Sequence, residues 1–307
     1  MNVSRETLAL QPGLSPQVRG WRMLPSMSRH AALAIHTAAD FAATFDVSRE
    51  TLHQLEIYER LLRQWQKAVN LVAPSTLDDV WHRHFADSAQ LLPLTPPGTR
   101  TWVDLGSGAG FPGLVVAILL AGSLPPRATC PPPPGGEGLG VGGTPTLDVL
   151  QSPPPCPSPT RGEGTTKAAG GEPLRGESPR VTLIESNARK CAFLREVVRQ
   201  TGIGGRIAVD ILSTRIETAA TQATLPRPDV VSARALAPLD RLLALAAPLF
   251  GPATVGLLMK GREAAQEVET ARSMWDFNVE LIPSRTEPEG HIVVIRQPRP
   301  QPKNEGN

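Results

Sequence analysis

A glycine-rich turn between two apolar segments constrains this chain more than any other feature. Residues 101–105 (TWVDL) have the composition of a buried strand, and residues 114–120 (LVVAILL) have that of a buried helix. Between them, Gly106, Gly108 and Gly110 allow a tight turn whose backbone N–H groups and helix N-terminus face a ligand. The sequence therefore predicts a doubly wound α/β sheet that binds a ligand at this loop.

The spacing of the glycines indicates which ligands fit the loop. The pattern G-x-G-x-G differs from the G-x-G-x-x-G of dinucleotide-binding domains, and no Gly-Lys-Ser/Thr follows it, which excludes a P-loop. Asp104 lies at the end of the predicted strand. A carboxylate there would repel a pyrophosphate but suits a cationic amino-acid group such as that of S-adenosylmethionine. A tight turn without a ligand is the alternative at this stage.

A second acidic strand end supports a cofactor that contains a nucleoside. Residues 180–185 (RVTLIE) form a predicted strand that ends in Glu185, where a carboxylate would bind a ribose diol. Residues 122–179 separate the two strands, are rich in Pro, Gly, Ser and Thr, and lack apolar periodicity. We interpret them as a disordered insertion. Without them Glu185 follows Gly106 by about 21 residues, close to the usual offset of about 20.

The rest of the chain divides into segments of different periodicity. Residues 1–46 are expected to be a poorly ordered extension, residues 47–98 a helical layer, residues 99–297 the cofactor-binding α/β domain that contains the insertion, and residues 298–307 a disordered tail. In the helical layer, Ser48 can cap a helix whose apolar side chains share one face. A second helix is predicted from Thr76.

Five further strands are predicted after Glu185, which gives seven in all. They lie at residues 206–211, 229–232, 255–259, 279–283 and 291–296. The last two are placed to form a hairpin-like pair. A seven-stranded Rossmann-like sheet of this kind is typical of methyltransferases and differs from a plain dehydrogenase domain.

The composition limits the partners and the location. The formal net charge is +2 over 307 residues, so an RNA site would require local clusters of arginine and lysine. No apolar run reaches 18 residues, so no membrane span is expected. Cys130, Cys156 and Cys191 show neither zinc-ligand spacing nor a disulfide framework. We therefore expect a cytoplasmic monomer without a metal ion.

Six short strings within this framework resemble one known family. They are residues 65–72 (WQKAVNLV), 83–88 (RHFADS), 103–113 (VDLGSGAGFPG), 231–236 (VSARAL), 258–262 (LMKGR) and 291–296 (HIVVIR). In combination they resemble the 16S rRNA (guanine-N7) methyltransferases, the glucose-inhibited division protein B family. The resemblance extends over about residues 48–297. The family usually lacks the insertion and the N-terminal extension.

The resemblance implies a reaction and a set of contacts. The reaction is transfer of a methyl group from S-adenosylmethionine to N7 of a guanine in the 530-loop of 16S rRNA, within the small ribosomal subunit. Taken together with the acidic strand ends, the expected cofactor contacts are Asp104, Gly106, Gly108, Phe111, Glu185, Ile216, Glu217 and Arg234. The candidate RNA contacts are Arg83, His84, Lys260 and Arg262.

The chemistry of guanine N7 predicts catalysis by positioning. N7 carries a lone pair and no proton, so its attack on a sulfonium methyl group needs no general base. We therefore assign no catalytic residue. Arg234 is the polar side chain that we expect nearest to the reaction, with a surface ion pair to Asp229 or Asp240 as the alternative.

Two questions stay open at this level. His84, Asp87 and Ser88 lie on one helical face, where they either anchor the helical layer to the α/β domain or contact RNA. A methyltransferase of the same fold that acts on a small molecule or a protein would share these features. So would a non-catalytic, cofactor-binding protein of ribosome assembly.

Overall fold

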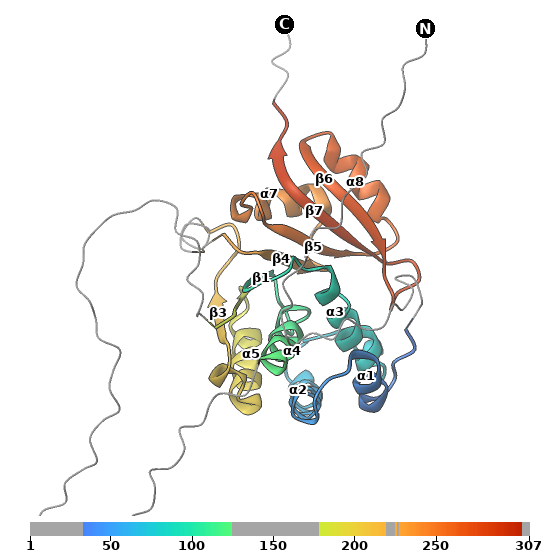
Figure 1. The fold of residues 1–307 in the computed structure, drawn as a ribbon, viewed down its shortest axis with the longest axis vertical. Coiled ribbons are helices and arrows are strands. Elements are labelled where there is room, and N and C mark those ends of the chain that lie inside the picture. Colours follow the sequence, from blue (N-terminus) through green and yellow to red (C-terminus); the bar gives the residue numbers. More distant parts are fainter. Residues whose placement is uncertain (1–32, 125–177, 219–224, 226, 303–307) are drawn as a thin grey trace, which may run out of the picture. The chain divides into compact units, whose positions relative to one another are not determined.

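A single seven-stranded sheet with helices on both faces organises the protein (Figure 1). The computed structural model describes residues 33–124, 178–218, 225 and 227–302. The strands are β1 (Thr101–Leu105), β2 (Arg180–Glu185), β3 (Ala208–Ser213), β4 (Val230–Arg234), β5 (Val255–Lys260), β6 (Trp275–Pro283) and β7 (His291–Pro300). Strands β1 to β5 are parallel, and β7 is antiparallel to both β5 and β6. The predicted doubly wound, seven-stranded sheet with its terminal hairpin is confirmed.

The order of the strands locates the ligand site. Within the sheet the order is β3-β2-β1-β4-β5-β7-β6, so the direction of winding reverses between β1 and β4. In open α/β sheets, ligands bind at the carboxyl ends of the strands where this reversal occurs. Leu105 lies opposite Ala233 in the register of these two strands. The glycine loop, which follows β1 directly, therefore lies at the position where a ligand is expected.

Two hydrophobic cores divide the helices into two layers (Figure 1). One face of the sheet carries α4 (Gly113–Ser123), α5 (Ala188–Thr201) and α2 (Arg49–Gln66), and the other carries α7 (Leu239–Ala246) and α8 (Ala264–Arg272). Helix α4 is apolar on nearly all sides because it packs against both the sheet and α2. Gly122 allows this approach, since a Cβ there would stand 2.1 Å from the hydroxyl oxygen of Thr51.

The N-terminal helical layer begins earlier in the chain than predicted. Helix α2 starts after Ser48, whose hydroxyl accepts the predicted capping hydrogen bond. The residues before it were assigned to a poorly ordered extension, yet they include α1 (Ala38–Phe45). The reason is local: Thr37 and Asp40 form a reciprocal capping box, and Phe41 is fully buried. An eight-residue helix presents too few turns for its period to be read from the sequence.

Other boundaries also differ from the prediction. The single helix predicted from Thr76 is instead a 3₁₀ turn (Pro74–Thr76), a π-helical segment (Trp81–Ala86) and the short α3 (Asp87–Ala89), because apolar spacing does not distinguish these kinds of turn. Strand β7 continues past residue 297 because it pairs with β6 as far as Pro300.

Some of the predictions fall on parts of the chain that the structure does not describe. Most of the predicted insertion, Cys130 and Cys156 lie outside the described residues. So do residues 1–32 and 303–307. Among the helices that are described, none is both long enough and apolar enough to cross a membrane.

Candidate active site

Other parts of the protein pack against the glycine loop at Gly106 and Gly110 and leave it open at Gly108. Gly106, Gly108 and Gly110 all have positive φ angles, of 63°, 57° and 97°. A Cβ at Gly106 would stand 2.6 Å from the side chain of Leu236, and a Cβ at Gly110 would stand 2.5 Å from the hydroxyl of Tyr58. A Cβ at Gly108 would meet only a backbone oxygen at 3.8 Å. The loop therefore offers its backbone to a ligand at Gly108.

Glu185, at the end of β2, lies against this open side. Its Oε2 accepts a hydrogen bond from the backbone N–H of Gly108 at 2.9 Å, and its Oε1 accepts one from the N–H of Asn187 at 2.7 Å. Asn187 in turn caps the N-terminus of α5. A hydroxyl group that donates to Glu185 would thus lie next to the loop. This placement suits the predicted ribose contact.

Asp104, which we expected to face a cationic group of the cofactor, points into the protein. It is fully buried, and its carboxylate accepts hydrogen bonds from the hydroxyl of Ser232 at 2.7 Å and the N–H of Gly113 at 3.3 Å. Ser232 itself accepts from the indole N–H of Trp102. Burial raises the pKa of Asp104 to about 6, against the effect of these hydrogen bonds. Asp104 therefore joins β1, β4 and the start of α4, and an ammonium contact is not part of this geometry.

Phe111 is enclosed by the helical layer and is not exposed to a ligand. Its ring stacks on the rings of Tyr58 and His84, with centroid distances of 5.3 and 4.8 Å, and the guanidinium of Arg234 lies 5.7 Å from its centroid. The hydroxyl of Tyr58 donates to the carbonyl of Ala109. Burial raises the pKa of Tyr58 well above its ordinary value, which keeps the hydroxyl a donor. The helical layer thus supports the glycine loop from behind.

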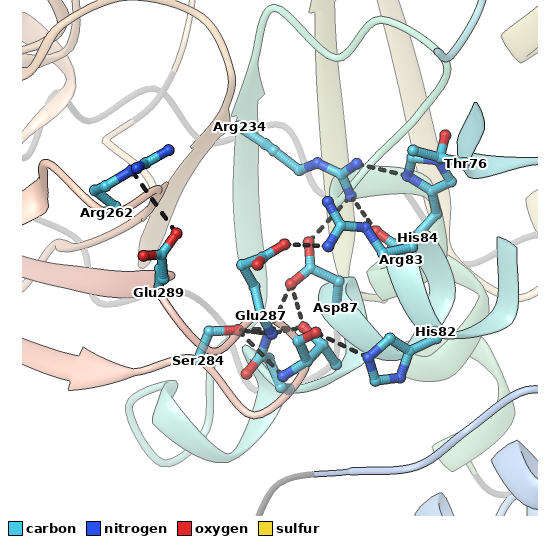
Figure 2. A network of polar contacts seen from close by, with 12 residues as sticks. Thr76, His82, Arg83, His84, Asp87, Arg234, Arg262, Ser284, Glu287 and Glu289 are labelled. Atoms are coloured by element: carbon cyan, nitrogen blue, oxygen red, sulfur yellow. Dashed lines mark hydrogen bonds and ion pairs between the residues drawn. The ribbon is translucent and has the colours of Figure 1, made fainter. Parts of the chain in front are cut away.

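Arg234, at the end of β4, is the centre of a polar network that joins β4 to the helical layer (Figure 2). Its guanidinium donates to Oδ2 of Asp87 at 3.1 Å, to Nδ1 of His84 at 2.5 Å and to the carbonyl of Arg83 at 3.2 Å. Because an arginine can only donate, Nε2 of His84 carries the hydrogen and donates to the hydroxyl of Thr76 at 2.8 Å. Burial, followed by the charges of Arg234 and Arg83, lowers the pKa of His84 to about 3. The imidazole is therefore neutral.

Asp87 extends this network to the loop between β6 and β7. Its Oδ1 accepts a hydrogen bond from the hydroxyl of Thr286 at 2.6 Å. Burial raises the pKa of Asp87, and the charge of Arg234 opposes this rise. The ion-pair partner of Arg234 is thus Asp87, and the predicted alternative of Asp229 or Asp240 is wrong. The network ties three parts of the chain together: the helical layer, β4 and the terminal hairpin.

The remaining predicted cofactor residues lie at the same edge of the sheet. Ile216 and Glu217 follow the end of β3 at Ser213 after two further residues. Ile216 is buried and Glu217 is exposed. Because β3 is the neighbour of β2, they lie beyond Glu185 when viewed from the glycine loop. This position suits an apolar ring at the far end of a nucleoside.

Two of the four candidate RNA contacts present an exposed charge. The side chains of Arg83 and Arg262 are 42% and 74% exposed. Lys260 is only 9% exposed because its ammonium group donates to Glu267 at 2.7 Å, and His84 is buried in the polar network. The geometry therefore leaves Arg83 and Arg262 available for phosphate, whereas the polar atoms of Lys260 and His84 are used within the protein.

A cavity of about 200 Å³ opens beside the network at the carboxyl ends of β4 and β5. We call it the β4–β5 cavity. Its lining includes Arg83 and Asp87 from the helical layer, Arg234 from β4 and Glu287 from the loop between β6 and β7. Because β4 is paired with β1, this cavity and the glycine loop lie at neighbouring positions along one edge of the sheet. The protein thus has two adjoining sites: the glycine loop with the acidic Glu185, and the β4–β5 cavity with Arg83 and Arg234.

One family's sequence profile matches the chain across both sites. It is described as rRNA small subunit methyltransferase G, and it matches residues 51–123 and 174–293. This chain belongs to that family. Curated relatives named ribosomal RNA small subunit methyltransferase G occur in Rhodospirillum centenum, at 44% identity over 86% of this chain and 92% of the relative, and in Parvibaculum lavamentivorans, at 41% identity over 83% and 87%. An O-methyltransferase structure from Bacillus cereus in complex with SAH covers 79% of this chain and 91% of its own at 11% identity, with a TM-score of 0.42.

Three residues that build the site in this member of the rRNA small subunit methyltransferase G family were not predicted. Tyr58 lies on the apolar face of its helix, where the sequence indicates only packing, and Thr286 and Glu287 lie in the loop between β6 and β7. The polar turn between two predicted strands could have indicated a loop at the ligand-binding edge. No local signal links Thr286 to Asp87, because these residues are 199 positions apart.

Proposed function

We propose that this chain transfers a methyl group from S-adenosylmethionine to N7 of a guanine in the 530-loop of 16S rRNA, on the small ribosomal subunit in the cytoplasm. One observation carries the proposal: the open glycine loop with its acidic strand end adjoins the β4–β5 cavity, which contains arginines. The names of the curated relatives refer to rRNA of the small subunit. The choice of guanine and of its N7 atom rests on the six strings that resemble the 16S rRNA (guanine-N7) methyltransferases.

The residues at the glycine loop fit a cofactor made of a nucleoside and an amino acid. Gly108 leaves space where a Cβ would stand, and Glu185 provides an acceptor for ribose hydroxyl groups. Gly106 and Gly108 would hold the cofactor at the loop, Glu185 at the ribose, and Ile216 and Glu217 at the adenine. When bound, S-adenosylmethionine supplies an electrophilic methyl group on a sulfonium.

The protein's own residues act on the acceptor by positioning. Because N7 has no proton to lose, the site must fix the base and tolerate the positive charge that it gains. We had expected Arg234 nearest to the reaction, but its donors are engaged by His84, Asp87 and the carbonyl of Arg83. We therefore assign Arg234 a positioning role: it fixes the helical layer against β4 and so shapes the β4–β5 cavity.

The decisive experiment uses small subunits from cells that lack this enzyme, the purified full chain and methyl-labelled S-adenosylmethionine. Methylated N7 positions are mapped by borohydride reduction and aniline cleavage. A single cleavage in the 530-loop is the expected result. The variant Glu185→Ala should lose both labelling and cofactor binding in calorimetry. Glu289→Gln, which changes an exposed carboxylate away from the glycine loop, should retain both.

Other outcomes of this experiment point to other functions. Cofactor binding without label in the subunit would favour a different acceptor or a non-catalytic role in ribosome assembly. Label at a different base or atom would retain the rRNA methyltransferase and overturn the assignment of the target.

A further inference from the structure

Among the described residues, two carboxylates line the β4–β5 cavity, and only that of Glu287 is free of hydrogen bonds from Arg234. Asp87 also lines the cavity, but its oxygens accept hydrogen bonds from Arg234 and Thr286. Glu287 is different. Its side chain is 37% exposed, and its carboxylate is paired with the exposed Arg83 (Figure 2). Exposed ion pairs of this kind contribute little to stability, so a ligand can replace Arg83 at little cost.

The position of the cavity relates it to the transferred group. Arg234 and Gly106 each follow one position after the register pair Ala233 and Leu105 of the adjacent strands β4 and β1. An acceptor in the β4–β5 cavity would therefore lie one strand away from a cofactor on the glycine loop. Neighbouring strands lie about 4.8 Å apart, so ligands at these two strand ends can meet at one edge of the sheet.

We propose that Glu287 binds the Watson–Crick edge of the acceptor guanine and stabilises the charge that the base gains. This inference rests on the proposed function. Guanine presents the N1–H and N2–H₂ donors on the edge away from N7, and the carboxylate accepts from both. Arg83, released from Glu287, turns to a phosphate of the RNA.

The charge balance explains why a carboxylate belongs at this edge. The lone pair of N7 forms the new bond to carbon, the bond between carbon and sulfur breaks, and its electron pair stays on sulfur. The purine then carries one positive charge, and its N1–H and N2–H₂ groups become stronger donors. The interaction with Glu287 is therefore stronger in the transition state than in the bound substrate, which lowers the barrier.

The same loop provides a matched control. Glu289 lies two positions away, pairs with Arg262 at 3.7 Å and is 65% exposed. It is not among the residues that line the β4–β5 cavity, and Figure 2 shows it apart from the Arg234 network. The variants Glu287→Gln and Glu289→Gln remove the same charge from the same loop, and only the first should affect the chemistry.

The test measures methyl transfer to small subunits at saturating S-adenosylmethionine. We expect Glu287→Gln to lower kcat by about 100-fold, Glu287→Asp to lower it less, and Glu289→Gln to leave it near the wild-type value. Cofactor affinity from calorimetry should be the same in all four proteins. Subunits reconstituted with inosine at the target position lack N2–H₂, and they should slow the wild type by about tenfold and Glu287→Gln by much less.

Each failure can be recognised. If the wild type methylates the subunit and Glu287→Gln does not differ from Glu289→Gln, the proposed contact is wrong and the proposed function stands. An equal effect of inosine on the wild type and on Glu287→Gln would also overturn the contact. If the wild type transfers no methyl group to guanine in the subunit, the proposed function fails, and this contact fails with it.

Discussion

We expect Arg234→Met to destabilise the fold, because it removes the cation of a largely buried ion pair. The side chains of Arg234 and Asp87 are 22% and 15% exposed, and the atoms of the pair are 3.1 Å apart. Methionine retains an apolar stem of similar length, so the substitution isolates the charge and its hydrogen bonds. From the sequence we expected Arg234 nearest to the reaction. Its pair with Asp87 adds a loss of stability to the expected effect of the substitution.

The loss of stability in Arg234→Met follows from Asp87, whose charge is left without a partner. An unpaired charge from a broken, fully buried pair costs about 3–5 kcal/mol of unfolding free energy. Because these two side chains keep some exposure, we expect the lower end, about 3 kcal/mol, or about 6–12 °C in Tm for a domain of this size. Asp87→Asn removes the opposite charge, and its amide oxygen can still accept from Thr286. The double variant lacks both charges. The double variant should therefore lose less free energy of unfolding than the two single variants together, by at least about 1.5 kcal/mol.

Urea unfolding of the wild type, both single variants and the double variant measures this coupling. Arg262→Met is the control, since Arg262 is 74% exposed, and its effect should stay within about 0.5 kcal/mol. Losses that add to within about 0.5 kcal/mol would refute the paired arrangement. The pH dependence gives a second check. Burial already raises the native pKa of Asp87, and without Arg234 it rises further, so the deficit of Arg234→Met should shrink as the pH falls toward the ordinary pKa of a carboxyl.

Three further predictions concern other parts of the molecule. Tyr58→Phe leaves the buried carbonyl of Ala109 without its donor. The free energy of unfolding should fall by about 1–3 kcal/mol, and calorimetry should show weaker cofactor binding. If neither stability nor cofactor affinity changes, Tyr58 does not support the glycine loop. The native pKa of His84 is about 3 and lies below its ordinary 6.5, so stability should fall as the pH drops from 6.5 toward 3, and His84→Gln should flatten this slope; equal slopes would show that His84 is not responsible. The family profile omits residues 124–173, so deletion of residues 125–173 should preserve Tm and methyl transfer. A large loss of either would show that this segment contributes.

Much of the fold could be predicted because its signals are local. The glycine loop, the apolar strands and the capping residue Ser48 depend on residues within a few positions of each other. The acidic end of β2 was found because its offset from Gly106 becomes normal once a segment without apolar periodicity is set aside. The errors at α1 and after Thr76 arose where elements are short or where different helical turns share one apolar spacing.

The sequence by itself determined the sheet, the position of the glycine loop and the membership of the rRNA small subunit methyltransferase G family. Only the tertiary structure decided which polar side chains face the ligand. Asp104 and Phe111 follow or end strands at the correct edge, yet both are turned into the protein. Arg234 lines the β4–β5 cavity, but its donors are engaged by His84, Asp87 and the carbonyl of Arg83, whereas the carboxylate of Glu287 is paired with the exposed Arg83. A strand end fixes the edge of the sheet at which a residue lies. The direction and burial of its side chain depend on partners far away in the chain, and those partners meet only when the helical layer and the terminal hairpin pack against the sheet.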